Sequence, residues 1–203
     1  MTGKMSRPLN LLYGRGGVTK DEKAGFALLK PLAENGRARA QFQLASCFRW
    51  GLGVEKDEKQ AVEWYRKAAE QGFAKAQHNL GVCLASGRGV DKDEKQAVEW
   101  CRKAAEQGYA QAQHNLGVRF AYGIGIDKDE KQAVQWWHKA AVQGFAIAQH
   151  NLGVCFHNGA GVDKDERQAA TWYRKAADQK YSAAMIALAN FEMNTEKALE
   201  LLA

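Results

Sequence analysis

Apolar and polar positions along this chain follow the period of an α-helix, in segments that recur in pairs. In residues 74–86, Ala76, Leu80 and Leu84 lie four residues apart and form one apolar face. In the segment from 94 to about 107, apolar residues again share one side and charged residues share the other. The pattern therefore predicts two amphipathic helices in each unit.

The predicted helix pair recurs at a strict step of 36 residues. A fixed period of roughly 20 to 50 residues is typical of arrays in which each unit buries its apolar face on its neighbours. The step is visible in a leucine column, a glycine column and a tryptophan column: Leu44, Leu80, Leu116, Leu152 and Leu188; Gly53, Gly89, Gly125 and Gly161; and Trp64, Trp100, Trp136 and Trp172.

The repeat predicts one continuous solenoid domain with a cap at each end. Residues 1–37 form a partial N-terminal repeat whose first helix is shortened to about Pro8–Tyr13, and residues 38–181 form four full repeats. Residues 182–203 form a partial C-terminal repeat, in which residues 195–203 are expected to be a shortened second helix.

Start and stop signals recur with the repeat. Asp93 with Gln96 predicts an N-cap and a capping box at the start of the second helix, and glycines follow both helices. Gly81 lies inside the first helix and predicts close approach by another helix. Pro8 and Pro31 both precede the regular units, so we expect no helix breaker in the array.

Composition and charge narrow the classes of function. The chain has 203 residues and a formal charge of +6, which is spread along every repeat and is low for a dedicated nucleic-acid binder. No stretch approaches the roughly 20 apolar residues of a membrane span, so membrane insertion is not expected. Residues 1–10 lack an apolar h-region, which favours a cytoplasmic location; a trimmed N-terminus would instead allow a secreted or periplasmic one.

The four cysteines leave two interpretations open. Cys47, Cys83 and Cys155 occupy equivalent repeat positions, about 10 Å apart in stacked helices, which exceeds the reach of a disulfide. Cys83 and Cys101 share a repeat and are the one pair that a disulfide would join. The other interpretation, which we favour, is buried free thiols in a reducing compartment.

The repeated motifs resemble the Sel1-like repeat over about residues 10–194. They are Leu80-Gly81-x-x-Leu84, Gly87-x-Gly89-Val90, Asp93-x-x-x-Ala97, Trp100-Cys101 and Lys103-Ala104-Ala105. The resemblance implies an all-α fold, an α/α solenoid with a right-handed superhelix, and a scaffold or adaptor role in protein–protein contacts. In bacteria it implies host-interaction factors, envelope-stress or secretion-associated adaptors, or immunity partners.

One side of the first helices is the candidate binding surface. By analogy with tetratricopeptide arrays, the side opposite the apolar face lines a concave groove, and asparagine amides there suit the backbone of an extended peptide. The alternative to a binding role is a structural one: duplication of the repeat copied these residues, and Asn79 only bridges adjacent first helices. The predicted groove residues are Arg39, Gln43, Trp50, Lys75, His78, Asn79, His114, Asn115, Tyr122, His150 and Asn151.

No constellation of residues predicts catalysis, a metal site or a cofactor. The glycines at 14–17 lack the lysine of a phosphate-binding loop, and the histidines and cysteines have neither HExxH nor CxxC spacing. The tryptophan column is expected in the core.

A non-enzymatic scaffold for a protein or peptide partner is the favoured function. A helical-repeat binder of nucleic acid or glycans is the alternative, motivated by Arg39, Arg49, Lys75 and Arg119, and a hydrolase is the weakest candidate. The sequence makes no prediction about oligomeric state.

Overall fold

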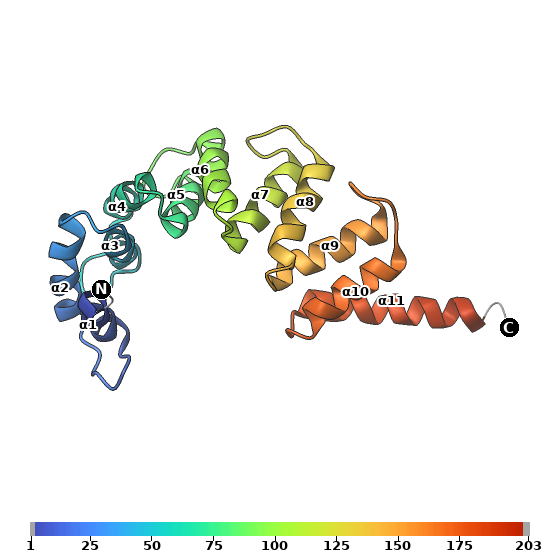
Figure 1. The fold of residues 1–203 in the computed structure, drawn as a ribbon, viewed down its shortest axis with the longest axis horizontal. Coiled ribbons are helices and arrows are strands. Elements are labelled where there is room, and N and C mark those ends of the chain that lie inside the picture. The colour runs from blue at the N-terminus through green and yellow to red at the C-terminus, as the bar shows by residue number, and fades with distance from the viewer. Residues whose placement is uncertain (1–2, 201–203) are drawn as a thin grey trace. The chain divides into compact units, whose positions relative to one another are not determined.

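In a computed structural model, which describes the backbone of residues 3–200 and the side chains of residues 5–193, all regular structure is helical (Figure 1). Helices pack in consecutive pairs, and equivalent helices from α2 to α10 begin 36 residues apart. The all-α repeat fold is therefore confirmed. The helices of this described part are α1 (Gly3–Tyr13), α2 (Glu22–Glu34), α3 (Ala38–Trp50), α4 (Glu58–Glu70), α5 (Ala74–Ser86), α6 (Glu94–Glu106), α7 (Ala110–Tyr122), α8 (Glu130–Ala141), α9 (Ala146–Asn158), α10 (Glu166–Ala177) and α11 (Ser182–Glu200).

The chain divides into two compact units, residues 1–104 and residues 105–203. In the first unit, the first helices α1, α3 and α5 follow one side and the second helices follow the other (Figure 1). Leu12, Leu44 and Leu80 are fully buried in this unit. The second unit buries the equivalent leucines of α7 and α9 in the same way. A single continuous solenoid domain with the boundaries given above stays a prediction.

Each second helix begins at the predicted aspartate N-cap, but the capping box is incomplete. The side chain of Asp93 accepts a hydrogen bond from the Gln96 backbone N–H at 2.9 Å. The reciprocal bond to the Asp93 backbone N–H is not made by glutamine, since this N–H donates to the Leu84 carbonyl at 2.9 Å. The capping-box prediction is wrong in this half, because the tight loop brings the last turn of the first helix within reach.

The glycines inside α5, α7 and α9 lie where the following second helix comes close. A Cβ at Gly117 would lie 2.6 Å from the Trp137 ring, and a Cβ at Gly153 would lie 2.5 Å from the Tyr173 ring. At Gly81 the nearest atom would be the Ala97 carbonyl oxygen, at 3.1 Å. The predicted close approach is confirmed.

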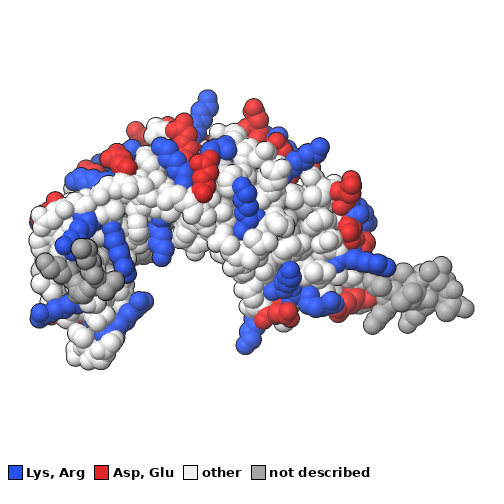
Figure 2. Space-filling view, viewed as in Figure 1, with Lys and Arg blue, Asp and Glu red and all other residues white. Residues whose placement is uncertain are grey.

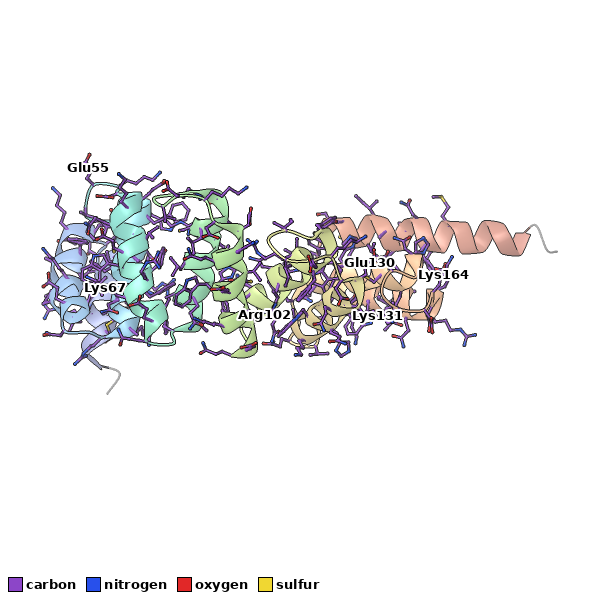
Figure 3. All side chains as sticks on the ribbon, turned by 90° about the horizontal axis from the view of Figure 1, so that it is seen from above. Glu55, Lys67, Arg102, Glu130, Lys131 and Lys164 are labelled. Carbon is purple, nitrogen blue, oxygen red and sulfur yellow. The ribbon has the colours of Figure 1, made fainter. Side chains whose placement is uncertain are left out.

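The tryptophan column belongs to the core, as predicted. Trp136 and Trp172 are buried, and Trp64 and Trp100 are partly buried against core residues of the first unit. A lysine three residues further on lies over each ring; Lys67 Nζ, for example, is 4.0 Å from the ring centroid of Trp64 (Lys67 is labelled in Figure 3). The lysine stem shields the ring from solvent while the ammonium group gains a cation–π contact.

On the face drawn in Figure 2, charged side chains of both signs lie close to one another in each unit. At the start of each second helix a lysine pairs with the glutamate two residues later, at N–O distances of 2.6–3.1 Å. Exposed pairs of this kind contribute little to stability, so their main effect is to hold the glutamate side chain in one position.

Two expectations about the chain ends are corrected, the start of the first helix and the separate helix from residue 195. Helix α1 begins at Gly3, before Pro8, and both Pro8 and Pro31 lie inside helices, each removing one backbone hydrogen bond. Helix α11 continues without a break from Ser182 to Glu200. No separate second helix begins at 195, because no glycine interrupts the segment, and residues 201–203 lie outside the described residues.

Candidate binding surface

All of the predicted groove residues lie on first helices, where equivalent positions recur within each unit. Arg39, Gln43 and Trp50 are on α3; Lys75, His78 and Asn79 on α5; His114, Asn115 and Tyr122 on α7; and His150 and Asn151 on α9. Their exposure differs. Trp50 and Tyr122 expose 65% and 74% of their surface, and Arg39 and Lys75 are exposed, whereas Gln43 and the histidines and asparagines are half-buried.

The histidine rings turn toward the neighbouring helices. The His114 ring lies 5.4 Å from the Phe145 ring, and the His150 ring lies 5.6 Å from Tyr173 and 5.5 Å from Tyr181. The Nδ1 atoms of His114 and His150 are buried and have no hydrogen-bond partner among the described residues. Burial lowers the pKa of all three imidazoles, that of His78 to about 4, where Arg49 adds to the effect. The imidazoles are therefore neutral at pH 7 and contribute mainly to packing.

These histidines predict a loss of stability in mild acid. A histidine whose folded pKa is depressed takes up a proton more readily in the unfolded chain, so its contribution is complete above pH 6.5 and is lost as the pH falls toward the folded pKa. For His78 the shift from 6.5 to about 4 corresponds to about 2 kcal/mol lost by pH 5. Urea unfolding at pH 7 and pH 5 measures this loss.

The matched variants for this titration are His78→Gln and His157→Gln. His157 lies on the exposed surface of the same fold and contacts Glu166. We expect His78→Gln to reduce the difference between pH 7 and pH 5, and His157→Gln to leave most of it in place. An unchanged difference in His78→Gln would contradict the assignment.

The asparagine amides are available to a partner. Asn79, Asn115 and Asn151 are half-buried, and their side-chain amides form no hydrogen bond with any other described residue. The bridge between first helices that the structural alternative assigned to Asn79 is therefore absent from the described part of the chain. Gln43, at the equivalent position of α3, accepts a hydrogen bond from the Tyr13 hydroxyl at 3.2 Å.

A set of buried glutamines that the sequence pattern did not predict lies beside the candidate surface. Gln149 Nε2 donates to the Ala141 carbonyl at 3.1 Å, and its Oε1 accepts from Gln179 at 2.8 Å. The same two bonds recur one repeat earlier around Gln113. The set comprises Gln41, Gln77, Gln113 and Gln149, each 5% exposed. The available signal was the pairing of two glutamine columns 30 residues apart, which a search for apolar periodicity passes over.

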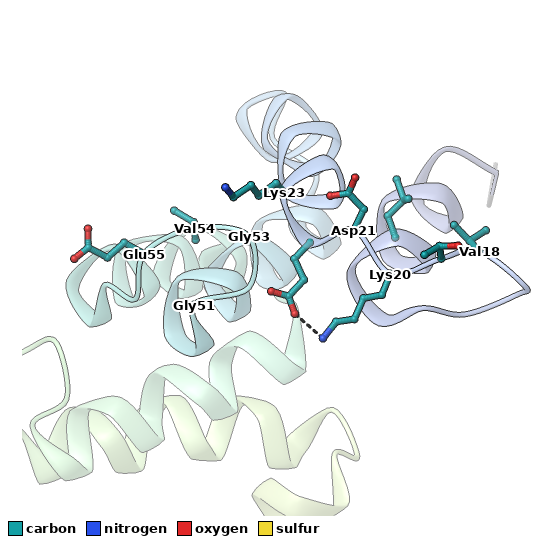
Figure 4. Close-up of a pocket in the computed structure, with 11 residues that line it drawn as sticks. Val18, Lys20, Asp21, Lys23, Gly51, Gly53, Val54 and Glu55 are labelled. Atoms are coloured by element: carbon teal, nitrogen blue, oxygen red, sulfur yellow. Dashed lines mark ion pairs between the residues drawn. The ribbon is translucent and has the colours of Figure 1, made fainter.

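Of two cavities, one is lined by predicted groove residues and the other is not. In the first unit an open hollow of about 1000 Å³ lies between the 18–23 and 51–55 segments, where Lys20 pairs with Glu22 at 2.6 Å (Figure 4). It holds none of the predicted groove residues. In the second unit a cavity of about 270 Å³ brings together Tyr122 and Asn151, two of those residues.

No group of three histidine, cysteine or acidic side chains within the described part of the chain is placed to hold a metal ion. The described cysteines are buried and form no disulfide, including the Cys83–Cys101 pair. Burial raises the pKa of Cys47 to about 12, with the Glu22 charge adding to it, so this thiol stays protonated at neutral pH. No described helix is long and apolar enough to cross a membrane.

A profile of the Sel1 repeat matches the chain five times, at residues 4–36, 38–73, 74–109, 110–145 and 146–181. A search of curated proteins finds no significant match. Similar solved structures include a Sel1 repeat protein from Oxalobacter formigenes, which is 34% identical with a TM-score of 0.83 over 91% of this chain and 73% of its own.

Two further structures extend the comparison. A protective antigen of uropathogenic Escherichia coli with an SLR fold is 32% identical with a TM-score of 0.86; the match covers 91% of this chain but only 39% of the antigen. An immunity protein from Pseudomonas aeruginosa, 21% identical with a TM-score of 0.61, matches over 91% of this chain and 68% of its own length. At that identity the likeness concerns the fold alone.

Proposed function

Because the chain belongs to the Sel1 repeat family, we propose that it is a non-enzymatic scaffold that binds a partner protein or peptide on its first helices. Repeats of this family commonly mediate protein–protein interactions. A fold alone does not set a function, so the proposal depends on the site.

The observation that carries the proposal is the column of asparagine amides on α5, α7 and α9. Each amide offers one acceptor and two donors, and none of them is used by another described residue. Asn79, Asn115 and Asn151 are separated by one repeat each, so they present the same group at regular intervals along the chain. An extended peptide carries backbone donors and acceptors that need partners of this kind.

The surroundings of the asparagines favour a partner with acidic and apolar side chains. Helices α3, α5, α7 and α9 contain no aspartate or glutamate, and Arg39, Lys75 and Arg119 give them basic groups. Trp50 and Tyr122 expose their rings at the ends of α3 and α7. Tryptophan, tyrosine and arginine are enriched where protein interfaces form.

The test is the triple variant Asn79→Ala, Asn115→Ala, Asn151→Ala, with a partner isolated on the wild-type chain. We expect its affinity for the partner to fall at least about tenfold, which corresponds to about 1.4 kcal/mol. Thermal stability should be unchanged, because the amides make no bonds within the described chain. Affinity is measured by calorimetry and stability by thermal unfolding.

A matched control uses the second helices of three repeats at the same 36-residue spacing. Glu63, Glu99 and Gln135 are exposed on α4, α6 and α8. Their replacement by alanine should leave partner affinity within about twofold of the wild type. Equal affinity of the asparagine variant and this control would contradict binding through the first helices.

A further inference from the structure

The cavity in the second unit lies between α7, the start of α8 and α9. The residues that line it include Tyr122, Trp137, Asn151 and the paired Lys128 and Glu130. The small side chains of Ala121 and Ala160 leave its volume at about 270 Å³. In three other copies of the repeat the position of Ala121 carries a large polar side chain, namely Tyr13, Arg49 and His157.

The equivalent site two repeats earlier is filled by the chain itself. Positions 72 residues before Ala121 and Ala160 are Arg49 and Arg88, and these arginines, with Glu58, border a space of only about 10 Å³. The two guanidinium groups also act on the carboxylate. The Lys56 bond is the main cause of the lowered pKa of Glu58, and the charges of Arg88 and Arg49 lower it further.

In two other copies of the repeat, a larger side chain at the position equivalent to Ala121 also occupies the site. One repeat later this position is His157, whose Nδ1 lies 3.0 Å from Glu166 Oε2, while Lys164 holds Oε1 at 2.9 Å. In the first repeat the position is Tyr13, whose hydroxyl donates to Gln43, the counterpart of Asn151. Each of these sites therefore receives a polar side chain from its own chain.

Glu130, like Glu58, has one carboxylate oxygen without a hydrogen bond or ion pair to a described residue, and its site differs from that of Glu58 because no arginine lines its cavity. Lys128 Nζ lies 2.7 Å from Oε1, and no described residue forms a hydrogen bond or ion pair with Oε2 (Glu130 is labelled in Figure 3). The Glu166 site, where His157 Nδ1 lies on Oε2, shows that the lysine pair leaves room for a second nitrogen group on that oxygen. The Glu130 side chain is 45% exposed, against 36% for Glu58 beside its arginines.

We propose that this cavity binds an arginine side chain of the partner protein, with the guanidinium group on the free oxygen of Glu130. The proposal rests on the proposed scaffold function and adds the identity of one anchor residue of the partner. The occupant is suggested by the chain itself, which places arginine at this site in the first unit. A planar guanidinium also suits a wall of aromatic rings and an amide better than a compact ammonium does.

The wall of the cavity is held in place before any ligand arrives. Trp137 Nε1 donates to the His114 carbonyl at 3.2 Å, and the ring packs against Gly117 of α7. Burial, with a contribution from the Glu130 charge, raises the pKa of Cys155 to about 11. The thiol is therefore neutral, so the charged side chains that line the cavity are Glu130 and its partner Lys128.

The test uses the ¹⁵N-labelled full chain and the acetylated, amidated tripeptide Gly-Arg-Gly, with the citrulline tripeptide as an uncharged isostere. We expect saturable shifts of the Trp137 indole and Asn151 amide signals with the arginine peptide and at least tenfold weaker binding of the citrulline peptide. The variant A121R/A160R copies the filled site of the first unit and should bind at least tenfold more weakly. E130Q should do the same without filling the cavity, and E58Q should bind like the wild type.

Equal binding of the two peptides, or undiminished binding by both A121R/A160R and E130Q, would overturn the arginine pocket. The partner isolated on the wild-type chain separates this inference from the proposed function. A partner that binds A121R/A160R as tightly as the wild type but is lost with the asparagine variant overturns the pocket alone. A partner weakened by both variants supports the pocket.

Discussion

Replacing Gly89 by alanine is expected to lower the free energy of unfolding by about 3 kcal/mol. The expected loss combines the cost of a left-handed backbone at an L-residue, about 1–2 kcal/mol, with that of overpacking, about 1–3 kcal/mol. Gly89 has φ of +69°, and a Cβ there would lie 2.1 Å from the Glu58 carbonyl oxygen. That oxygen belongs to the backbone of α4 in the preceding repeat, so relief requires the two repeats to move apart. Urea unfolding of the full chain measures the loss.

Gly72 provides the matched control for this substitution. Its φ is +83°, yet no atom lies within 4 Å of a Cβ built there. Gly72→Ala should therefore cost only the backbone term, about 1–2 kcal/mol. Equal losses in the two variants would show that the loop does not make the tight contact between repeats described for Gly89.

Replacing Gln149 by leucine is expected to cost about 3 kcal/mol, because leaving a buried polar group unsatisfied costs about 1–3 kcal/mol and two bonds are lost. Gln149 is 5% exposed and links the end of α8, through the Ala141 carbonyl, to Gln179 after α10. Leucine has a similar volume but neither donor nor acceptor. Urea unfolding again gives the change.

The control for the glutamine substitution is Gln135→Leu, at an exposed position on α8. We expect it to change the free energy of unfolding by no more than about 0.5 kcal/mol, as surface substitutions usually do. If Gln149→Leu were as mild as this control, the buried glutamines would not be what joins adjacent repeats.

Local signals predicted most of the fold. The aspartate caps, the glycine stops and the apolar face around Leu80 each act within one or two turns of helix, and they fixed the helices of the regular repeats. The errors lie where local signals are weak. Nothing in the sequence from 182 to 200 stops a helix, so a boundary inferred from the repeat alone was misplaced.

The candidate site was predicted less fully, because its properties depend on neighbouring repeats. The helical period placed His150 on the side away from Leu152, but Tyr173 and Tyr181 from later elements cover its ring. The helical period predicts the side of the helix on which a residue lies, but it does not predict which side chains of the next repeat cover that residue. The arginine pocket had a visible signal, since the column containing Ala121 reads tyrosine, arginine, alanine, alanine, histidine. Its meaning required knowing that this column faces the glutamate that begins each second helix.

The central claim is that the first helices of this repeat scaffold carry the surface that binds a partner. Hydrogen exchange of the full chain, alone and saturated with a partner isolated on it, tests the claim most directly. We predict slower exchange in α3, α5, α7 and α9, including the turns that hold Asn79, Asn115 and Asn151, with little change in α4, α6 and α8. Protection confined to the second helices would contradict the claim.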